Sequence, residues 1–207
     1  MKRSCIWTMV VLAAAVSALA ESVVLEDYNG KGVLSGNEYY GSNDPDNSIN
    51  KHPGYIRVKW QKGYAMYKSV GKKKIDLNQT GSISYDYRTT KKGEHFDADR
   101  AVELRLYVLE GVEKGYLFRY ATDSLIDDGD WHRVCIPMSS FIVLDPKIPP
   151  KDKSNVYSLQ IGINSYSQDK DKMEVDLKDI VAHSDAVDGV KQIPAEVPKD
   201  AGKATNP

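Results

Sequence analysis

Hydrophobic residues recur at every second position through most of the chain. In segment 101–109, Val102, Leu104, Leu106 and Val108 alternate with polar residues, a period of two that is typical of half-buried β-strands. Strands are also predicted over residues 55–60, 64–70, 83–88, 131–138, 159–164 and 173–177, over the apolar run 23–25, and over the aromatic, β-prone run 116–121. Amphipathic helical patterns are rare. The sequence therefore predicts an all-β domain of about nine strands, arranged as a two-sheet antiparallel β-sandwich.

Other segments lack this alternation, and they set the expected limits of the domain. Residues 29–51 are rich in Gly, Asn, Asp and Ser and are predicted to form a polar loop. Residues 184–207 have only isolated apolar residues and are predicted to form a flexible, disordered C-terminal tail. The β-sandwich is thus expected to span residues 21–183. Ile180 is out of phase with Val175 and Leu177, which predicts a bulge near Lys178 and Asp179.

The first twenty residues have the pattern of a secretory signal. Lys2 and Arg3 precede an apolar run over residues 6–16, and a small-x-small motif ends at Ala20. A membrane anchor is the alternative, but a bilayer span needs about 20 apolar residues. We therefore expect residues 1–20 to be a signal peptide, an N-terminal signal helix that is cleaved. The mature protein would be secreted or periplasmic, without membrane insertion.

Charge and cysteine content exclude some partners. The formal net charge is −1, and the loss of Lys2 and Arg3 would make the mature chain more acidic. Nucleic acids and anionic membranes favour strongly basic surfaces, so neither is an expected partner. Cys5 would leave with the signal and Cys135 would remain alone, without an internal disulfide. Cys135 is either a reactive thiol or a buried or half-buried side chain that packs as a small apolar group, and we favour the second role.

Three motifs resemble the galactose-binding-like jelly rolls of secreted carbohydrate-binding modules. These are Leu25-Glu26-Asp27-Tyr28, the block 75–88 with its turn and alternating strand, and the W-x-x-V-x-I-P pattern that begins at Trp131. The resemblance covers most of residues 22–183. It implies a non-catalytic module that recognises a polysaccharide or glycan. The same fold also hosts protein-interaction modules, so a structural or protein-interaction module of the cell envelope, docking on another secreted protein, is the alternative.

Sugars are bound by aromatic rings and by polar groups that hydrogen-bond their hydroxyls. Polar residues that alternate with core positions are candidates for this role on one sheet face, namely Arg105, Tyr107, Arg133, Gln160 and Asn164. Glu103 adds an acceptor, and Tyr39 and Tyr40 could line a loop edge. The alternative is that such polar residues only face water. Trp60, Tyr64 and Tyr67 are other possible platforms, although the parity of Trp60 favours the core.

A structural Ca²⁺ is a second candidate, because Ca²⁺ is bound by six to eight oxygen ligands. Asp44 and Asp46 lie in one oxygen-rich loop, and the resemblance implies that Glu26 and Asp176 on the first and last strands pair near a calcium. Lys178 stands where the resemblance favours a carboxylate, which weakens this prediction. An Asx-rich turn without metal is the alternative, and it is slightly favoured.

Catalytic motifs are not found. The histidines His52, His95, His132 and His183 have no zinc-type spacing, and no nucleophile elbow or phosphate-binding loop occurs. His132 and Cys135 are three residues apart in a predicted strand, so their side chains should point to opposite faces. We therefore do not expect an enzyme.

Overall fold

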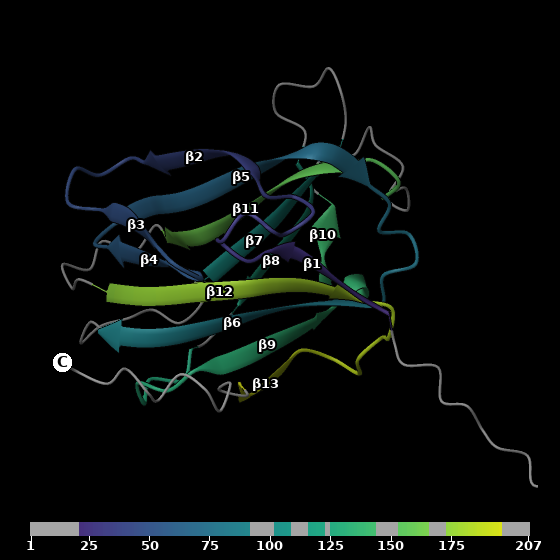
Figure 1. Ribbon diagram of the computed structural model, residues 1–207. Coiled ribbons are helices and arrows are strands. Elements are labelled where there is room, and N and C mark those ends of the chain that lie inside the picture. The colour runs from purple at the N-terminus through teal and green to yellow at the C-terminus, as the bar shows by residue number, and fades with distance from the viewer. Residues whose placement is uncertain are drawn as a thin grey trace, which may run out of the picture.

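The computed structural model describes residues 21–91, 102–108, 116–122, 125–143, 153–165 and 173–195. Their strands form two antiparallel sheets, of seven and six strands, that pack face to face (Figure 1). The predicted all-β sandwich is thus confirmed. The signal peptide predicted for residues 1–20 lies outside the described residues. Within the described ranges, no helix is long and apolar enough to cross a bilayer.

Sheet A has the strand order β13-β9-β6-β12-β4-β3, and β1 also pairs with β12. Its strands are β1 (Ser22–Glu26), β3 (Ser48–His52), β4 (Tyr55–Trp60), β6 (Ser82–Lys91), β9 (His132–Pro137), β12 (Met173–His183) and β13 (Lys191–Pro194). In Figure 1, β12, β6, β9 and β13 form the lower part of the molecule.

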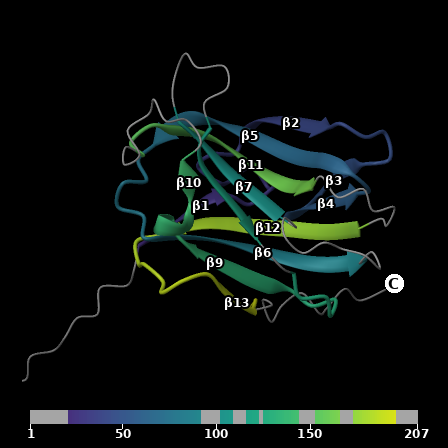
Figure 2. The same cartoon turned by 180° about the vertical axis from the view of Figure 1, so that it is seen from behind.

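Sheet B has the strand order β10-β8-β7-β11-β5-β2. Its strands are β2 (Gly36–Ser42), β5 (Gly63–Ile75), β7 (Val102–Val108), β8 (Tyr116–Thr122), β10 (Ile142–Val143) and β11 (Val156–Ser165), and a 3-10 turn, η2 (Met138–Ser140), precedes β10. Figure 2 shows the same two layers from behind, with β5 and β11 above β12 and β6.

The core consists of the inward-facing residues that the alternation predicts. Leu104 and Leu106 of β7 and Ile161 of β11 come from sheet B, while Tyr85 and Leu177 come from sheet A, and all five are fully buried. Burying one such side chain contributes about 1.5–3 kcal/mol. Trp60 and Tyr67 also belong to this core, at 3% and 0% exposure, so neither is a surface stacking platform.

The predicted bulge lies where the phase of β12 changes. The pairing of β12 with β6 shifts between Lys178 and Val181, and Asp179 has a positive φ of 50°. This extra residue allows Leu177 and Ile180 both to face the core, where each is fully buried. The interrupted alternation in the sequence is therefore a property of the fold.

Two segments differ from the sequence-based expectation. The predicted loop 29–51 contains β2 and most of β3, and the predicted tail contains β13, which pairs with β9 over residues 191–194. These strands are held by backbone hydrogen bonds to a neighbour, and such bonds do not require apolar side chains. The ordered domain consequently extends to Ala195, whose backbone N–H donates to the carbonyl of Trp131. Residues 196–207 lie outside the described residues.

The role of β13 can be tested by truncation. A chain that ends at Val190 loses the four paired residues of β13 and the buried Ala195. We expect its free energy of unfolding to fall by about 2 kcal/mol, because each net hydrogen bond contributes about 1 kcal/mol. Urea unfolding measures this change. A chain that ends at Ala195 is the control and should unfold at the same urea concentration as the full chain; equal stability of both truncated chains would refute a structural role for β13.

Candidate functional site

Five side chains lie in one row across the outward face of sheet B. Lys68 of β5 is the register partner of Gln160 on β11. Gln160 is also the partner of Arg105 on β7, and Arg105 is the partner of Arg119 on β8. Tyr39 of β2 pairs with Lys68 at the other end. We call these five residues the cross-strand row. Directly opposite side chains of neighbouring strands start about 5 Å apart, so the row is continuous.

A buried carboxylate holds the row in place. Glu103 is on the same face as Arg105 and is fully buried. It is bonded to Nε of Arg105, lies 2.7 Å from Nε of Arg119, and accepts a hydrogen bond of 2.7 Å from Nδ2 of Asn164. Charge-assisted hydrogen bonds are shorter and stronger than neutral ones. Glu103 therefore fixes the positions of two guanidinium groups and one amide.

A second set of contacts connects the row to Tyr107. Oε1 of Gln160 accepts hydrogen bonds from the Tyr107 hydroxyl and from Nη1 of Arg105, the latter at 3.4 Å. Nζ of Lys68 lies 4.4 Å from the centre of the Tyr107 ring, a cation–π contact. Burial lowers the pKa of Lys68. Burial also acts to lower the pKa of Arg105, but the hydrogen bond and charge of Glu103 outweigh it and raise that pKa.

Aromatic rings are exposed at the β2–β5 side of this face. Tyr39 is 55% exposed and Tyr64, the register partner of Asn164, is 38% exposed. Gly162 of β11 lies beside Met66 of β5, and a Cβ added there would lie 2.1 Å from the carbonyl oxygen of Ala65. The strands approach so closely here that only glycine fits. The face therefore combines exposed aromatic rings with anchored polar groups.

Four of the predicted sugar-binding residues thus meet, together with Tyr39. Arg105, Tyr107, Gln160 and Asn164 share the outward face of sheet B because they alternate with core residues on adjacent strands. Sequence reasoning missed Lys68 and Arg119. Both alternate with core residues of their own strands, so the sequence places their side chains on an outward face. It does not show that β5 and β8 belong to the same sheet as β7 and β11.

Two predicted residues lie elsewhere. The first is Tyr40. It follows Tyr39 in strand β2, which replaces the predicted loop, so the two side chains point to opposite sides of the sheet. The centres of the Tyr40 and Tyr67 rings lie 5.6 Å apart, and the Tyr40 hydroxyl donates a hydrogen bond to the Glu38 carboxylate. Burial and the neighbouring Glu38 raise the pKa of Tyr40 to about 12. Arg133 lies in β9 of sheet A, where it forms a bidentate pair with Asp86 at 2.7 and 3.0 Å.

The outward face of sheet A carries its own charged group. Asp176, fully buried, accepts hydrogen bonds from Arg57 and Arg88 at distances of 2.6–3.3 Å. The Trp131 ring lies 4.8 Å from the Arg88 guanidinium and 4.5 Å from Nζ of Lys178. The cations of this group are thus already engaged by carboxylates or by the indole. Sequence reasoning used Trp131 only as the start of a fold motif and did not find this cluster.

The four carboxylates predicted for calcium do not meet. Glu26 accepts hydrogen bonds from the backbone N–H groups of Asp27 and Tyr28 and from the Ser35 and Tyr67 hydroxyls. Asp176 lies between two arginines, as described above. Asp44 contacts Lys62 at 3.2 Å and accepts a hydrogen bond from the backbone of Asp46. In the described part of the chain, no group of three or more His, Cys, Asp or Glu residues could hold a metal ion. Calcium stays a prediction, and these four residues do not form one site for it.

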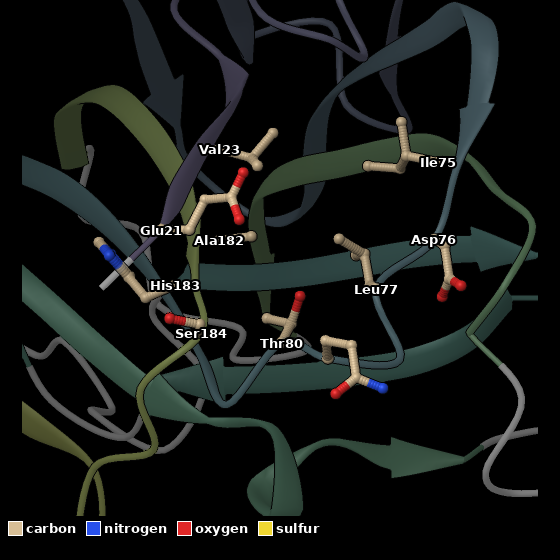
Figure 3. Close-up of a pocket in the computed structure, with 10 residues that line it drawn as sticks. Glu21, Val23, Ile75, Asp76, Leu77, Thr80, Ala182, His183 and Ser184 are labelled. Carbon is tan, nitrogen blue, oxygen red and sulfur yellow. The ribbon is translucent and has the colours of Figure 1, made fainter. Parts of the chain in front are cut away.

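A cleft of about 380 Å³ lies at one end of the sandwich. Figure 3 shows Glu21, Val23, His183 and Ser184 on one side of it and the segment 75–77 on the other. The segment between β5 and β6 therefore forms one wall, and the paired ends of β1 and β12 form the other. None of the residues predicted to bind sugar lines this cleft.

Among known proteins, no family model and no curated protein matches the chain. Similar solved structures include two family 11 carbohydrate-binding modules from Clostridium thermocellum. One, in complex with a β-1,3-1,4-mixed-linked tetrasaccharide, is 19% identical with a TM-score of 0.52, and the match covers 80% of this chain and 96% of that module. The other, from the cellulosomal cellulase Lic26A-Cel5E, is 18% identical with a TM-score of 0.51, and the match covers 80% of this chain and 95% of that module. PfGH50B is 10% identical with a TM-score of 0.52, and the match covers 82% of this chain and 24% of that one. The fold is thus the β-sandwich jelly roll of carbohydrate-binding modules.

The anchoring role of Glu103 predicts a change in stability. Glu103→Gln removes the negative charge between two guanidinium groups, so we expect the free energy of unfolding to fall by about 3 kcal/mol, the lower end of the cost of removing one partner of a buried ion pair. Thermal melting should report this as a fall of several degrees. Glu38→Gln is the matched control, because the Glu38 side chain is 26% exposed and its pair with Lys51 should contribute less than about 1 kcal/mol. Equal effects of the two substitutions would contradict the anchoring role.

Cys135 is half-buried on the outward face of sheet A, and His132 points inward, as their spacing predicted. Burial raises the pKa of the Cys135 thiol, although the charge of Arg133 partly opposes this. Because the thiolate is the reactive form, alkylation by iodoacetamide at pH 8 should be slower than that of free cysteine. The difference should narrow as the pH rises through the raised pKa. Alkylation at the rate of free cysteine, measured by mass spectrometry of the folded chain, would contradict this.

Proposed function

We propose that the chain is a secreted carbohydrate-binding module that recognises a polysaccharide or glycan on the outward face of sheet B and does not cleave it. The cross-strand row carries this proposal. It places hydrogen-bonding side chains from four neighbouring strands next to an exposed tyrosine. On the outward face of sheet A, Arg57, Arg88 and Arg133 are already engaged by carboxylates, and Lys178 lies over the Trp131 ring.

The row combines the two kinds of group that bind sugars, an aromatic ring and hydrogen-bonding side chains. Tyr39 offers a ring on which the C–H face of a pyranose can stack. Gln160 and Arg105 offer hydrogen bonds to ring substituents, with Tyr107 beside them. Glu103 and Tyr107 already hold these side chains in fixed contacts. Binding would therefore cost little side-chain entropy, which favours affinity for a ligand that makes few contacts.

The fold supports this proposal. A family 11 module with the same architecture over nearly its whole length was solved with a bound tetrasaccharide. The predicted signal peptide is consistent with a polysaccharide outside the cytoplasm as the target.

The composition of the face supports binding without hydrolysis. Most glycosidases need two carboxyl groups about 5–9.5 Å apart, facing one sugar bond. Among the described residues of the cross-strand row and its neighbours on β7 and β11, the single acidic side chain is Glu103. It is buried beneath Arg105, Arg119 and Asn164. A group that is enclosed in this way is not positioned to donate a proton to a glycosidic oxygen.

Two adjacent tyrosines provide the test. We expect the folded chain to be retained by at least one polysaccharide in a panel of insoluble and gel-embedded glycans. Tyr39→Ala should weaken that binding about tenfold, because stacking on an aromatic ring contributes roughly 1 kcal/mol beyond the area it buries. Tyr40→Ala, which changes the other side of β2, should bind like the unmodified chain.

Two results would count against the proposal. Equal loss of binding in both variants would place the ligand away from the sheet B face. Absence of binding to every glycan by a chain with the expected β-sheet circular dichroism would favour the protein-interaction module in its place.

A further inference from the structure

The sheet B face holds an imbalance between hydrogen-bond donors and acceptors. The Glu103 carboxylate is fully buried and shared by Arg105, Arg119 and Asn164, and the carbonyl oxygen of Gln160 already accepts two hydrogen bonds. The strongest acceptors of the row are therefore used within the protein. A neutral sugar hydroxyl both donates and accepts hydrogen bonds, so this face meets only part of its needs.

The donors of the row are less fully used. In the part of the chain that the structure describes, the charged group of Lys68 contacts the Tyr107 ring and lies near no carboxylate. Arg119 is paired through Nε, and its two Nη groups have no partner among the described residues. The amide Nε2 of Gln160, which lies between them in register, is likewise without one.

Charge shows the same imbalance. Between β5 and β8, the described outward side chains include the cations Lys68, Arg105 and Arg119 and the single anion Glu103. This face thus has a positive excess, although the whole chain has a formal net charge of −1. On sheet A, Arg57 and Arg88 both contact Asp176, and Arg133 pairs with Asp86, so each of these three cations has a carboxylate beside it. Lys68 of sheet B has the Tyr107 ring in that place.

We propose that the glycan bound by the cross-strand row is anionic, a polysaccharide that bears carboxylate or sulfate groups. This inference rests on the proposed function. Carboxylate and sulfate oxygens accept hydrogen bonds without needing to donate any, which matches the unused donors of Lys68, Gln160 and Arg119. Arginine in particular has a planar fork of donors that fits such groups in a bidentate way.

The spacing of the two cations indicates a polymer with repeated charges. Lys68 and Arg119 are three strands apart in the row, which corresponds to roughly 14 Å at about 4.8 Å per strand. A single charged sugar cannot reach both positions. Lys68 is also half-buried, and burial lowers its pKa, so an arriving anion would supply the counter-charge that this ammonium group lacks.

The experiment compares two polymers with their neutralised forms, using the full chain. One pair is polygalacturonate and the same polymer after reduction of its carboxyl groups, and the other is κ-carrageenan and its desulfated form. We expect at least one acidic form to bind the chain more tightly than its neutral counterpart by about tenfold or more, since a hydrogen bond to a charged group contributes about 1.5–3 kcal/mol. The pair that responds identifies the anionic group.

Point variants locate the effect. Lys68→Met keeps most of the side-chain length but removes the charge, and Arg119→Gln keeps a polar group; each should weaken binding of the acidic polymer about tenfold. Lys59→Met is the matched control, because Lys59 is an exposed lysine on the outward face of sheet A, paired with Glu174 at 3.4 Å. It changes the net charge of the chain by the same amount and should leave binding unchanged. Circular dichroism and melting curves establish that each variant is folded.

The outcomes separate this inference from the proposed function. If the neutral forms bind as well as the acidic forms, the ligand is a glycan but the anionic preference is wrong. If Lys59→Met weakens binding as much as Lys68→Met, the attraction is a property of the whole charged surface and the site is not the cross-strand row. If no polymer of either kind binds and the wider glycan panel is also negative, the proposed function fails together with the inference.

Discussion

The polar side chains on the outward face of sheet B are arranged around one buried charge. A carboxylate that is buried away from water stays ionised only when cations and hydrogen-bond donors surround it, since an unpaired buried charge has a large desolvation free energy. Glu103 meets this condition through Arg105, Arg119 and Asn164, which come from three strands. The side chains that would touch a ligand are therefore held by the same contacts that stabilise the carboxylate. A face with only exposed polar residues would have no such order.

Sheet A uses the same principle but pairs its cations differently. Asp176 and Asp86 are buried on its outward side beneath Arg57, Arg88 and Arg133. The difference between the faces lies in how the cations are paired. On sheet A each of the three arginines forms a close pair with a carboxylate, and Arg57 and Arg133 do so through two nitrogen atoms. On sheet B, Arg119 contacts Glu103 through Nε alone, and Lys68 contacts an aromatic ring in place of a carboxylate. Two surfaces with similar residue types can thus have different affinities for an anion.

The sequence alone predicts which side of a strand a residue occupies, and this was sufficient for much of the fold and part of the site. Period-two alternation correctly put Arg105, Tyr107, Gln160 and Asn164 outside the core. Which strands are neighbours depends on contacts between distant segments, so Lys68 was missed although β5 directly flanks β11. Arg133 was wrongly grouped with Arg105 for the same reason. β2 and β13 were missed because their order comes from pairing with a neighbour, which local composition does not record.

The pairing of β13 with β9 also affects how the molecule meets its neighbours. An unpaired outer strand offers a line of free N–H and C=O groups to which another chain can add, and proteins limit this with short outer strands, lysines and prolines. β13 is four residues long, begins with Lys191 and ends with Pro194, which has no N–H. β13 therefore pairs with the longer β9 and leaves an outer edge to which another strand cannot readily hydrogen-bond. The C-terminal segment thereby makes the addition of another strand at this edge of sheet A unfavourable.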